Sequence, residues 1–160
     1  MAGKNEPENS SAGPPDPETG VYIDSSALAK LYMPEPESER LDQFLRGLQD
    51  LMISELGITE VISAVARRKR EGALDSEQAN RIRDALWSDV KEGYFRRLDI
   101  TPAIHREAER MLLSTQSVAL RTLDALHIAL ALSGQAQRVL TFDDRMADAA
   151  ALHGLVLVEL

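Results

Sequence analysis

The chain has 160 residues, of which 44% are hydrophobic and 28% charged, a composition typical of one globular domain with a sizeable core. It contains no cysteine, which excludes disulfides and thiolate metal sites, and no apolar run approaches the roughly eighteen residues of a membrane span. The net charge of −8 and the aromatic content of 4% argue against a broad basic nucleic-acid-binding surface and against a base-stacking platform.

The first 20 residues differ in composition from the rest. They hold four of the seven prolines, three glycines and a net charge of −3. Such a segment cannot bury enough apolar surface to order itself, so we expect residues 1–20 to form a disordered tail and residues 21–160 to form the folded domain. The start of the chain also lacks the basic and apolar regions of a secretory signal, and we therefore expect a cytoplasmic protein.

Beyond this tail, short apolar runs alternate with helical patterns. The run 21–24 predicts a strand, and Ser25 or Ser26 is expected to cap the next helix, which Pro34 ends. Further strands are predicted at 51–54, 94–100, 138–142 and 155–159. Further helices are predicted at about 36–48, 55–70, 76–92, from 102 onward, 123–133 and 144–153. This alternation predicts an α/β fold with a mostly parallel sheet of about five strands, covered by helices on both faces.

Two of the predicted strands end in an acidic residue. Asp24 follows the first strand, and Asp143 follows the fourth strand, with Asp144 beside it. Ligands bind at the carboxyl ends of strands in open α/β sheets, so both positions fall where a site is expected. Each acid could instead cap the helix that follows its strand. We expect Asp144 to face solvent.

Two further acids lie in predicted helices that are largely apolar. The segment 123–132 is apolar on every side except at Asp124 and His127, and a helix of this kind is normally buried. Glu60 lies among apolar residues in the helix 55–70. Alternative roles are a favourable interaction with the helix dipole for Asp124 and the edge of a solvated face for Glu60. His127 is expected to be a satisfied, partly buried histidine.

Four stretches, each holding one of these acids, together resemble the PIN-domain family and most closely its VapC-type toxins. They are VYIDSSALAKLY, SELGITEVISAVARR, LRTLDALHIALAL and VLTFDDRMADAA, and the likeness covers residues 21–160. The resemblance implies a three-layer α/β/α sandwich and a metal-dependent endoribonuclease that acts on RNA. It also implies the toxin of a toxin–antitoxin pair, usually a homodimer, inhibited by a cognate antitoxin protein.

By this resemblance, the four acidic positions of the family are matched by Asp24, Glu60, Asp124 and Asp143. Ser26 and Thr141 match small hydroxyl positions that support the carboxylates in similar proteins. Clustered carboxylates repel one another unless a cation is bound, and oxygen ligands without cysteine select Mg²⁺ or Mn²⁺. We therefore expect the four acids to bind Mg²⁺, with Mn²⁺ as a substitute, and Glu60 to bind the metal or to orient the attacking water.

Phosphate contact is expected from local basic side chains, because the domain as a whole carries a charge of −5. The candidates are Lys30, Arg67, Arg68, Arg121 and Arg145. The basic run at 67–70 could instead be a solvated helix end, where cations suit the helix dipole, or an antitoxin contact.

Two other functions fit parts of this pattern. An aspartate-dependent phosphatase would use Asp24 as its nucleophile, although such enzymes usually carry a second acid two residues on, where this chain has Ser26. A non-catalytic PIN-like binding module would be favoured by missing acids, yet all four are present. RNA cleavage measured with Mg²⁺, with Mn²⁺ and with EDTA separates these functions.

Overall fold

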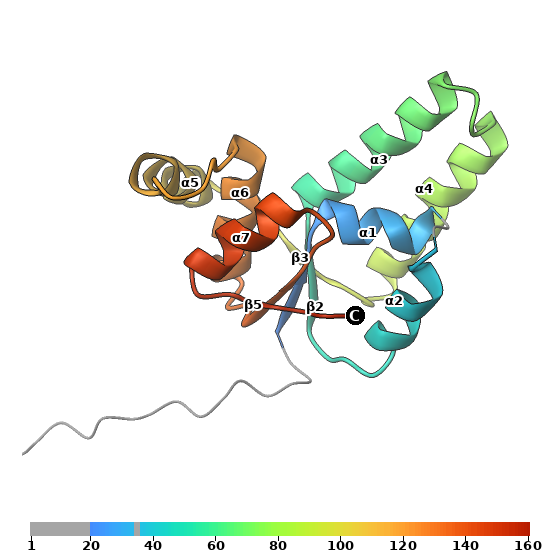
Figure 1. Ribbon diagram of the computed structural model, residues 1–160. Helices are drawn as coiled ribbons and strands as arrows, with labels where there is room; N and C mark the ends of the chain where they lie inside the picture. Colours follow the sequence, from blue (N-terminus) through green and yellow to red (C-terminus); the bar gives the residue numbers. More distant parts are fainter. Residues whose placement is uncertain (1–19, 34–35) are drawn as a thin grey trace, which may run out of the picture.

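The computed structural model describes residues 20–33 and 36–160, which form a five-stranded parallel sheet packed between helices (Figure 1). The strands β1 to β5 span Val21–Ile23, Leu51–Ser54, Arg96–Leu98, Arg138–Leu140 and Val156–Leu157. The helices α1 to α7 span Ser25–Tyr32, Ser38–Leu45, Glu55–Arg70, Ser76–Lys91, Pro102–Ser114, Thr122–Ser133 and Asp144–Leu152. The predicted α/β fold with its parallel sheet is confirmed. Within the described residues, no helix is long and apolar enough to cross a membrane.

The order of the strands places β1 at the centre of the sheet. The sheet reads β3-β2-β1-β4-β5, and Tyr22 of β1 pairs with Met52 of β2 on one side and with Val139 of β4 on the other. The chain therefore runs outward from β1 to β3 and then returns to the opposite side of β1 as β4. The carboxyl ends of β1 and β4 thus form a topological switch point, where open parallel sheets bind their ligands.

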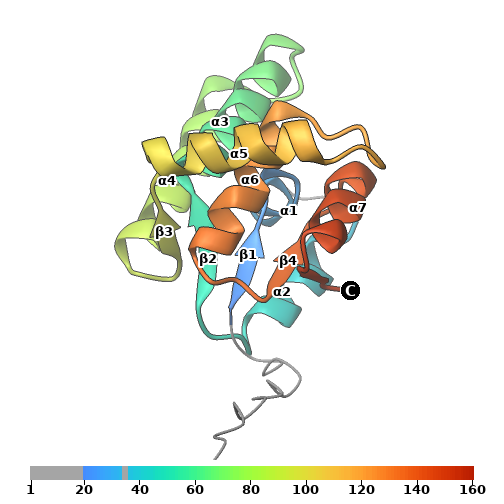
Figure 2. The ribbon, with the colours of Figure 1, turned by 90° about the vertical axis from the view of Figure 1, so that its left-hand side faces the viewer.

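Each face of the sheet packs against its own layer of helices. Side chains alternate along a strand, so Val21 and Ile23 belong to one hydrophobic cluster and Tyr22 belongs to the other. The first cluster includes buried side chains of α1 to α4, and the second includes those of α5, α6 and α7. Figure 2 looks onto the second layer, with α5 and α6 in front of the sheet. In α6, the residues from Ala125 to Ala131 are all buried, as its apolar sequence predicts.

Capping side chains set where the helices begin. The helix α1 is capped by Asp24, whose carboxylate accepts a hydrogen bond from the backbone N–H of Ala27, and the prediction of Ser25 or Ser26 as the cap is wrong. The reason is that Asp24 has extended backbone geometry, whereas both serines already lie in the first helical turn. The helix ends at Tyr32, and Pro34, which was predicted to end it, lies outside the described residues.

The strands β3, β4 and β5 are shorter than the apolar runs predict. The run 138–142 loses its last two residues because their polar groups serve the turn before α7. The backbone N–H of Phe142 donates to Ser26 Oγ, and Thr141 Oγ1 accepts from the N–H of Asp143. The strand β5 pairs only with β4 at one edge of the sheet, and its two residues are exposed.

Gly20 belongs to the folded domain and not to the predicted tail. It is buried, and its carbonyl accepts hydrogen bonds from the N–H groups of Gln137 and Arg138, at 2.9 and 3.1 Å. Its φ of +67° lies in the left-handed region, which favours glycine. The rest of the predicted tail, residues 1–19, lies outside the described residues, so its disorder stays a prediction.

Deleting residues 1–19 is expected to leave the free energy of unfolding unchanged, because their composition cannot build a core. Gly20→Ala is the matched contrast and should cost about 1–2 kcal/mol, since a Cβ is strained at a φ of +67°. Urea unfolding of the parent and both variants measures these effects. A deletion as costly as Gly20→Ala would show that the tail packs on the domain.

Candidate active site

Asp24 directly follows β1 and is a buried carboxylate, with 3% of its surface exposed. Its Oδ1 accepts hydrogen bonds from Ser26 Oγ at 2.7 Å and from the backbone N of Ala27 at 3.0 Å, and its Oδ2 accepts from Thr141 Oγ1 at 2.6 Å. Burial raises the pKa of Asp24, and the three hydrogen bonds, which favour the charged form, offset this rise only in part. Both oxygens of the carboxylate therefore accept hydrogen bonds, but its ionised form is still disfavoured by burial.

The two hydroxyls around Asp24 also hold the segment after β4. A hydroxyl carries one hydrogen and two lone pairs, so Ser26 and Thr141, which donate to Asp24, are left as acceptors. Ser26 Oγ accepts from the backbone N of Phe142 at 2.8 Å, and Thr141 Oγ1 accepts from the backbone N of Asp143 at 3.0 Å. The network that supports the first acid therefore also fixes the backbone that carries the fourth.

Asp143 is the N-cap of α7. Its Oδ1 accepts from the backbone N–H groups of Arg145 and Met146, at 2.9 and 3.2 Å. Asp143 is half-buried and lines the same cleft as Asp24, whereas Asp144 beside it is exposed. The capping role considered for Asp143 is therefore present, and it coexists with a position in the cleft.

Asp124 lies in the first turn of α6. Its Oδ2 accepts from the backbone N of Arg121 at 3.3 Å, so the helix-terminus role considered for it is present as well. The carboxylate is half-buried and lines the cleft that holds Asp24 and Asp143. An acid is compatible with this buried helix because it occupies the first turn of α6, which lines the cleft.

Glu60 extends from α3 and meets a partner that the sequence did not indicate. Its Oε2 lies 2.6 Å from Nε2 of His127, and the Nδ1 of the same ring lies 2.7 Å from the hydroxyl of Tyr22. Burial acts to raise the pKa of Glu60, but the hydrogen bond and charge of His127, together with Ser25, outweigh it and lower the pKa. Glu60 is half-buried, which fits the edge of a solvated face, and its carboxylate also lines the cleft that holds Asp24.

One cleft of about 380 Å³ brings the four predicted acids together. It lies where the carboxyl ends of β1 and β4 meet, as the strand order predicts. The acids that line it are Asp24, Glu60, Asp124 and Asp143. His127 and Ser25 also line it, although neither was predicted as a site residue. The spacing of His127 from Asp124, one helical turn, was the available signal, because such residues share a helix face.

The donor chemistry of this cleft fits a hard divalent cation, because carboxylate oxygens are its ionic side-chain groups apart from His127 and Arg121. Across residues 20–33 and 36–160, no three His, Asp or Glu side chains are grouped closely enough to hold a metal ion. Asp24 and Glu60 are instead bonded to donors of the protein itself. A shared ion would therefore require the carboxylates to approach one another.

A second cleft, of about 480 Å³, adjoins the first along α3. The two share Ser25, Ser26, Glu60 and Leu123 in their linings. Basic side chains line both: Arg121 the first cleft, and Arg67, Arg68 and Arg70 the second. Three of the five predicted phosphate contacts thus line the two adjoining clefts.

The other two predicted phosphate contacts have different surroundings. Lys30 forms an ion pair with Glu37 at 2.9 Å, and its Nζ lies 4.6 Å from the centre of the Phe142 ring. Arg145 is half-buried in the first turn of α7. Neither side chain lines the two clefts formed by the described residues.

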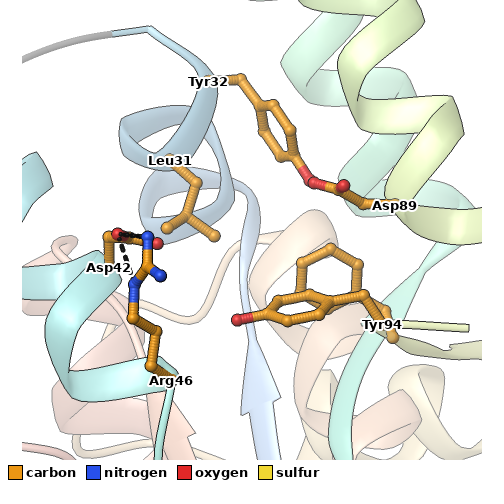
Figure 3. A pocket seen from close by; sticks show the side chains of 7 residues that line it. Leu31, Tyr32, Asp42, Arg46, Asp89 and Tyr94 are labelled. Carbon is orange, nitrogen blue, oxygen red and sulfur yellow. Dashed lines mark hydrogen bonds and ion pairs between the residues drawn. The ribbon is translucent and has the colours of Figure 1, made fainter. Parts of the chain in front are cut away.

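A separate cavity of about 320 Å³ lies among α1, α2 and α4 (Figure 3). Its polar side chains face one another: the Tyr32 hydroxyl donates to Asp89 Oδ2 at 2.6 Å, and Arg46 donates to Asp42 at 2.7 Å. Burial, reinforced by the bond to Asp89, raises the pKa of Tyr32. The four acids line the first cleft and not this cavity, so the candidate active site is the first cleft.

The sequence matches the model of the PIN domain over residues 21–152. The chain belongs to the PIN domain family. Ribonuclease VapC46 of Mycobacterium tuberculosis is 33% identical to it over 140 residues, which cover 86% of this chain and 95% of that protein. The family resemblance inferred from the four acid-bearing stretches is therefore confirmed.

Solved structures share the fold of this PIN domain. The M. tuberculosis toxin VapC20, described as cleaving the sarcin–ricin loop, superposes with a TM-score of 0.68 at 17% identity, over 88% of this chain and 99% of that one. VapBC2 of Rickettsia felis, bound to a DNA fragment of its promoter, gives a TM-score of 0.63 at 15% identity, with 88% and 98% covered. The predicted three-layer α/β/α architecture is confirmed by these superpositions.

Asp24 is expected to make the stability of this PIN domain depend on pH. Its folded-state pKa lies above the ordinary aspartate value of about 3.9, so the folded state binds the proton more tightly than the unfolded state does. Stability therefore falls as the pH rises from about 4 through the folded-state pKa.

Urea unfolding of the parent and of Asp24→Asn across this pH range isolates the effect of the one carboxyl. The free energy of unfolding of the parent, minus that of the variant, should decrease as the pH rises. A difference that grows with pH would mean that the hydrogen bonds to Asp24 outweigh its burial.

Proposed function

We propose that this PIN domain is a metal-dependent endoribonuclease, the toxin of a VapBC-type toxin–antitoxin pair. The observation that carries the proposal is the cleft at the carboxyl ends of β1 and β4, which four carboxylates line. Membership of the PIN domain family and the 33% identity to a protein named Ribonuclease VapC46 support cleavage of RNA as the reaction.

We assign Asp24, Asp124 and Asp143 to binding Mg²⁺, with Mn²⁺ as a substitute. A bound divalent cation supplies a water of lowered pKa and positive charge for the phosphate. Asp24 contributes a carboxylate whose orientation is fixed by three hydrogen bonds. Asp124 and Asp143 contribute carboxylates at the amino ends of α6 and α7, where the helix dipoles stabilise negative charge.

Glu60 is assigned either to the same ion or to the attacking water. Its Oε2 is bonded to His127, so that oxygen has a fixed direction. The lowered pKa of Glu60 keeps this carboxylate ionised at neutral pH, as acceptance of a proton from water or ligation of a cation requires. Ser26 and Thr141 support the reaction indirectly, through Asp24.

RNA is proposed to lie along the two adjoining clefts. Arg121 supplies positive charge in the cleft of the four acids, and Arg67 and Arg68 supply it in the adjoining cleft. Such local contacts are needed because the acidic domain does not attract a phosphate backbone by its overall charge. The scissile phosphate would then lie at the acids, and the strand would continue past the end of α3.

A cognate antitoxin and a second copy of the chain are the proposed protein partners. A toxin–antitoxin complex from Klebsiella pneumoniae shares the fold of this domain over 87% of the chain and supports an antitoxin partner. The homodimer rests on the family resemblance alone.

The phosphatase alternative is less well supported. Two residues after Asp24, the chain has Ser26, which donates a hydrogen bond to Asp24, where a second acid is usual in such phosphatases. A non-catalytic binding module is also disfavoured, because the four acids line one cleft.

RNA cleavage is expected to require a divalent metal. The purified chain should cut RNA with Mg²⁺ or Mn²⁺ and stop in EDTA, because the cleft offers carboxylates and no thiolate ligand. Equal cleavage in EDTA would contradict the proposal, and so would the release of phosphate from small phosphomonoesters in place of RNA cutting.

Asp24→Asn and Asp124→Asn are each expected to lower the cleavage rate at least about a hundredfold, about 2.7 kcal/mol of barrier, because each removes a charged ligand. Asp144→Ala is the matched control, since Asp144 is exposed beside the cleft. Single-turnover rates with saturating Mg²⁺ measure the effect. Near-parent rates for either Asn variant would reject the assignment of these acids.

Arg121→Gln is expected to raise KM for RNA with little change in kcat, because Arg121 lines the cleft and its charge attracts phosphate. The difference from the parent should shrink as salt is added, since added salt screens charge. Arg81→Gln is the control: Arg81 is an exposed residue of α4 that pairs with Glu77. If both variants behave alike, the cleft arginine makes no specific contact with RNA.

A further inference from the structure

His127 joins the centre of the sheet to an acid of the candidate active site. Its side chain is 4% exposed in the middle of α6, and both ring nitrogens have partners. Nδ1 lies 2.7 Å from the hydroxyl of Tyr22 in β1, and Nε2 lies 2.6 Å from Oε2 of Glu60 in α3. The ring also meets the Tyr22 ring edge-on, with centroids 5.8 Å apart and planes at 61°. The imidazole is therefore held from two opposite sides.

The far end of this connection is fixed as well. Tyr22 is fully buried, and its hydroxyl donates to Ser54 Oγ at 2.9 Å. Ser54 caps α3 and accepts from the backbone N of Gly57 at 3.0 Å. The chain of hydrogen bonds Ser54–Tyr22–His127–Glu60 thus starts at the beginning of α3, crosses β1 and α6, and returns to α3 at the acid.

A buried histidine needs partners for its polar nitrogens, and Tyr22 supplies one from within the core. The partner of the other nitrogen is a cleft acid whose side chain has three rotatable bonds and is half-buried. Without a donor at Oε2, this flexible side chain could take several rotamers. Donors of this kind orient ligand carboxylates and affect metal affinity and activity.

We propose that His127 is a positioning residue that acts through Glu60, holding its carboxylate in the orientation that the reaction uses. The proposal rests on the proposed function, which gives Glu60 its role. Tyr22 acts one step further back by holding the His127 ring, and it does not itself line the cleft formed by the described residues.

Two amide substitutions at His127 separate the effect of the bond to Glu60 from the effect of the bond to Tyr22. In His127→Gln, the amide nitrogen lies as many bonds from Cβ as Nε2 does, so the variant keeps a donor for Glu60 and loses the partner of Tyr22. In His127→Asn, the amide nitrogen replaces Nδ1, so the variant keeps a partner for Tyr22 and loses the donor to Glu60. Both remove the aromatic ring from the same buried position, and thermal melts of the two variants measure how their packing losses differ, since Asn is one methylene shorter than Gln.

His127→Asn is expected to lower kcat for RNA cleavage by roughly 10–100-fold, with KM little changed, and His127→Gln is expected to retain most of the activity. Circular dichroism and thermal melts establish that both variants are folded. Equal losses of kcat in the two variants would overturn the proposal, because only His127→Asn removes the donor to Glu60.

Tyr22→Phe tests the connection without touching the cleft and changes a single buried hydroxyl. It should lower kcat in the parent by no more than His127→Gln does, and it should have no further effect in His127→Gln, where the bond to Tyr22 is already lost. The same fold-change in both backgrounds would overturn the proposal, even if His127→Asn does not fold.

Crystal structures of the two amide variants supply a readout that does not depend on activity. The Glu60 carboxylate should keep its place in His127→Gln and leave it in His127→Asn. If the parent does not cleave RNA, the proposed function fails, and the position of Glu60 still decides the role of His127. An unmoved Glu60 in His127→Asn would overturn that role.

Discussion

A buried carboxylate needs hydrogen-bond donors, because burial without them is costly in free energy. The donors to Asp24 determine how β1, α1 and the segment after β4 are joined. These donors come from α1 and from the end of β4, more than a hundred residues away in the sequence. The hydroxyls of Ser26 and Thr141, having given their hydrogens to Asp24, accept from the segment that carries Asp143. One network thus joins β1 to β4 and places two acids at the same edge of the sheet.

The same groups serve the fold and the candidate active site. Asp24 and Asp143 cap helices, and Asp124 accepts from the backbone in the first turn of α6, so each has an ordinary structural role. These roles put the acids in the cleft, because α1 and α7 each follow a strand and begin at the carboxyl edge of the sheet, and α6, which leads into β4, begins at the same edge. A capping role is therefore no argument against a catalytic role at this edge.

Features that depend on the local pattern of residues can be predicted from the sequence. Contacts between residues that are distant in the sequence cannot. Buried strands, the buried helix α6 and acids at strand ends follow from apolar periodicity. The bond between Glu60 and His127 does not, because the two residues are 67 positions apart on different helices. The shortening of β4 does not follow from the sequence either. Thr141 and Phe142 continue the run that predicts the strand, but the Thr141 hydroxyl bonds to Asp24 and the Phe142 N–H bonds to Ser26, and both partners are distant in the sequence.

The central claim is that Asp124 shares a cation with the other cleft acids. The most direct test is a set of thermal melts of the parent and of Asp124→Asn, with and without Mg²⁺ at matched ionic strength. Mg²⁺ should stabilise the parent by about 2.7 kcal/mol at a hundredfold excess over Kd, and the variant much less. Without Mg²⁺ the variant should be as stable as the parent or more stable, because like charges are removed. An unshifted parent, beside a variant that is weaker by about 0.3–1 kcal/mol in both conditions, would show that Asp124 is only a helix-dipole acid.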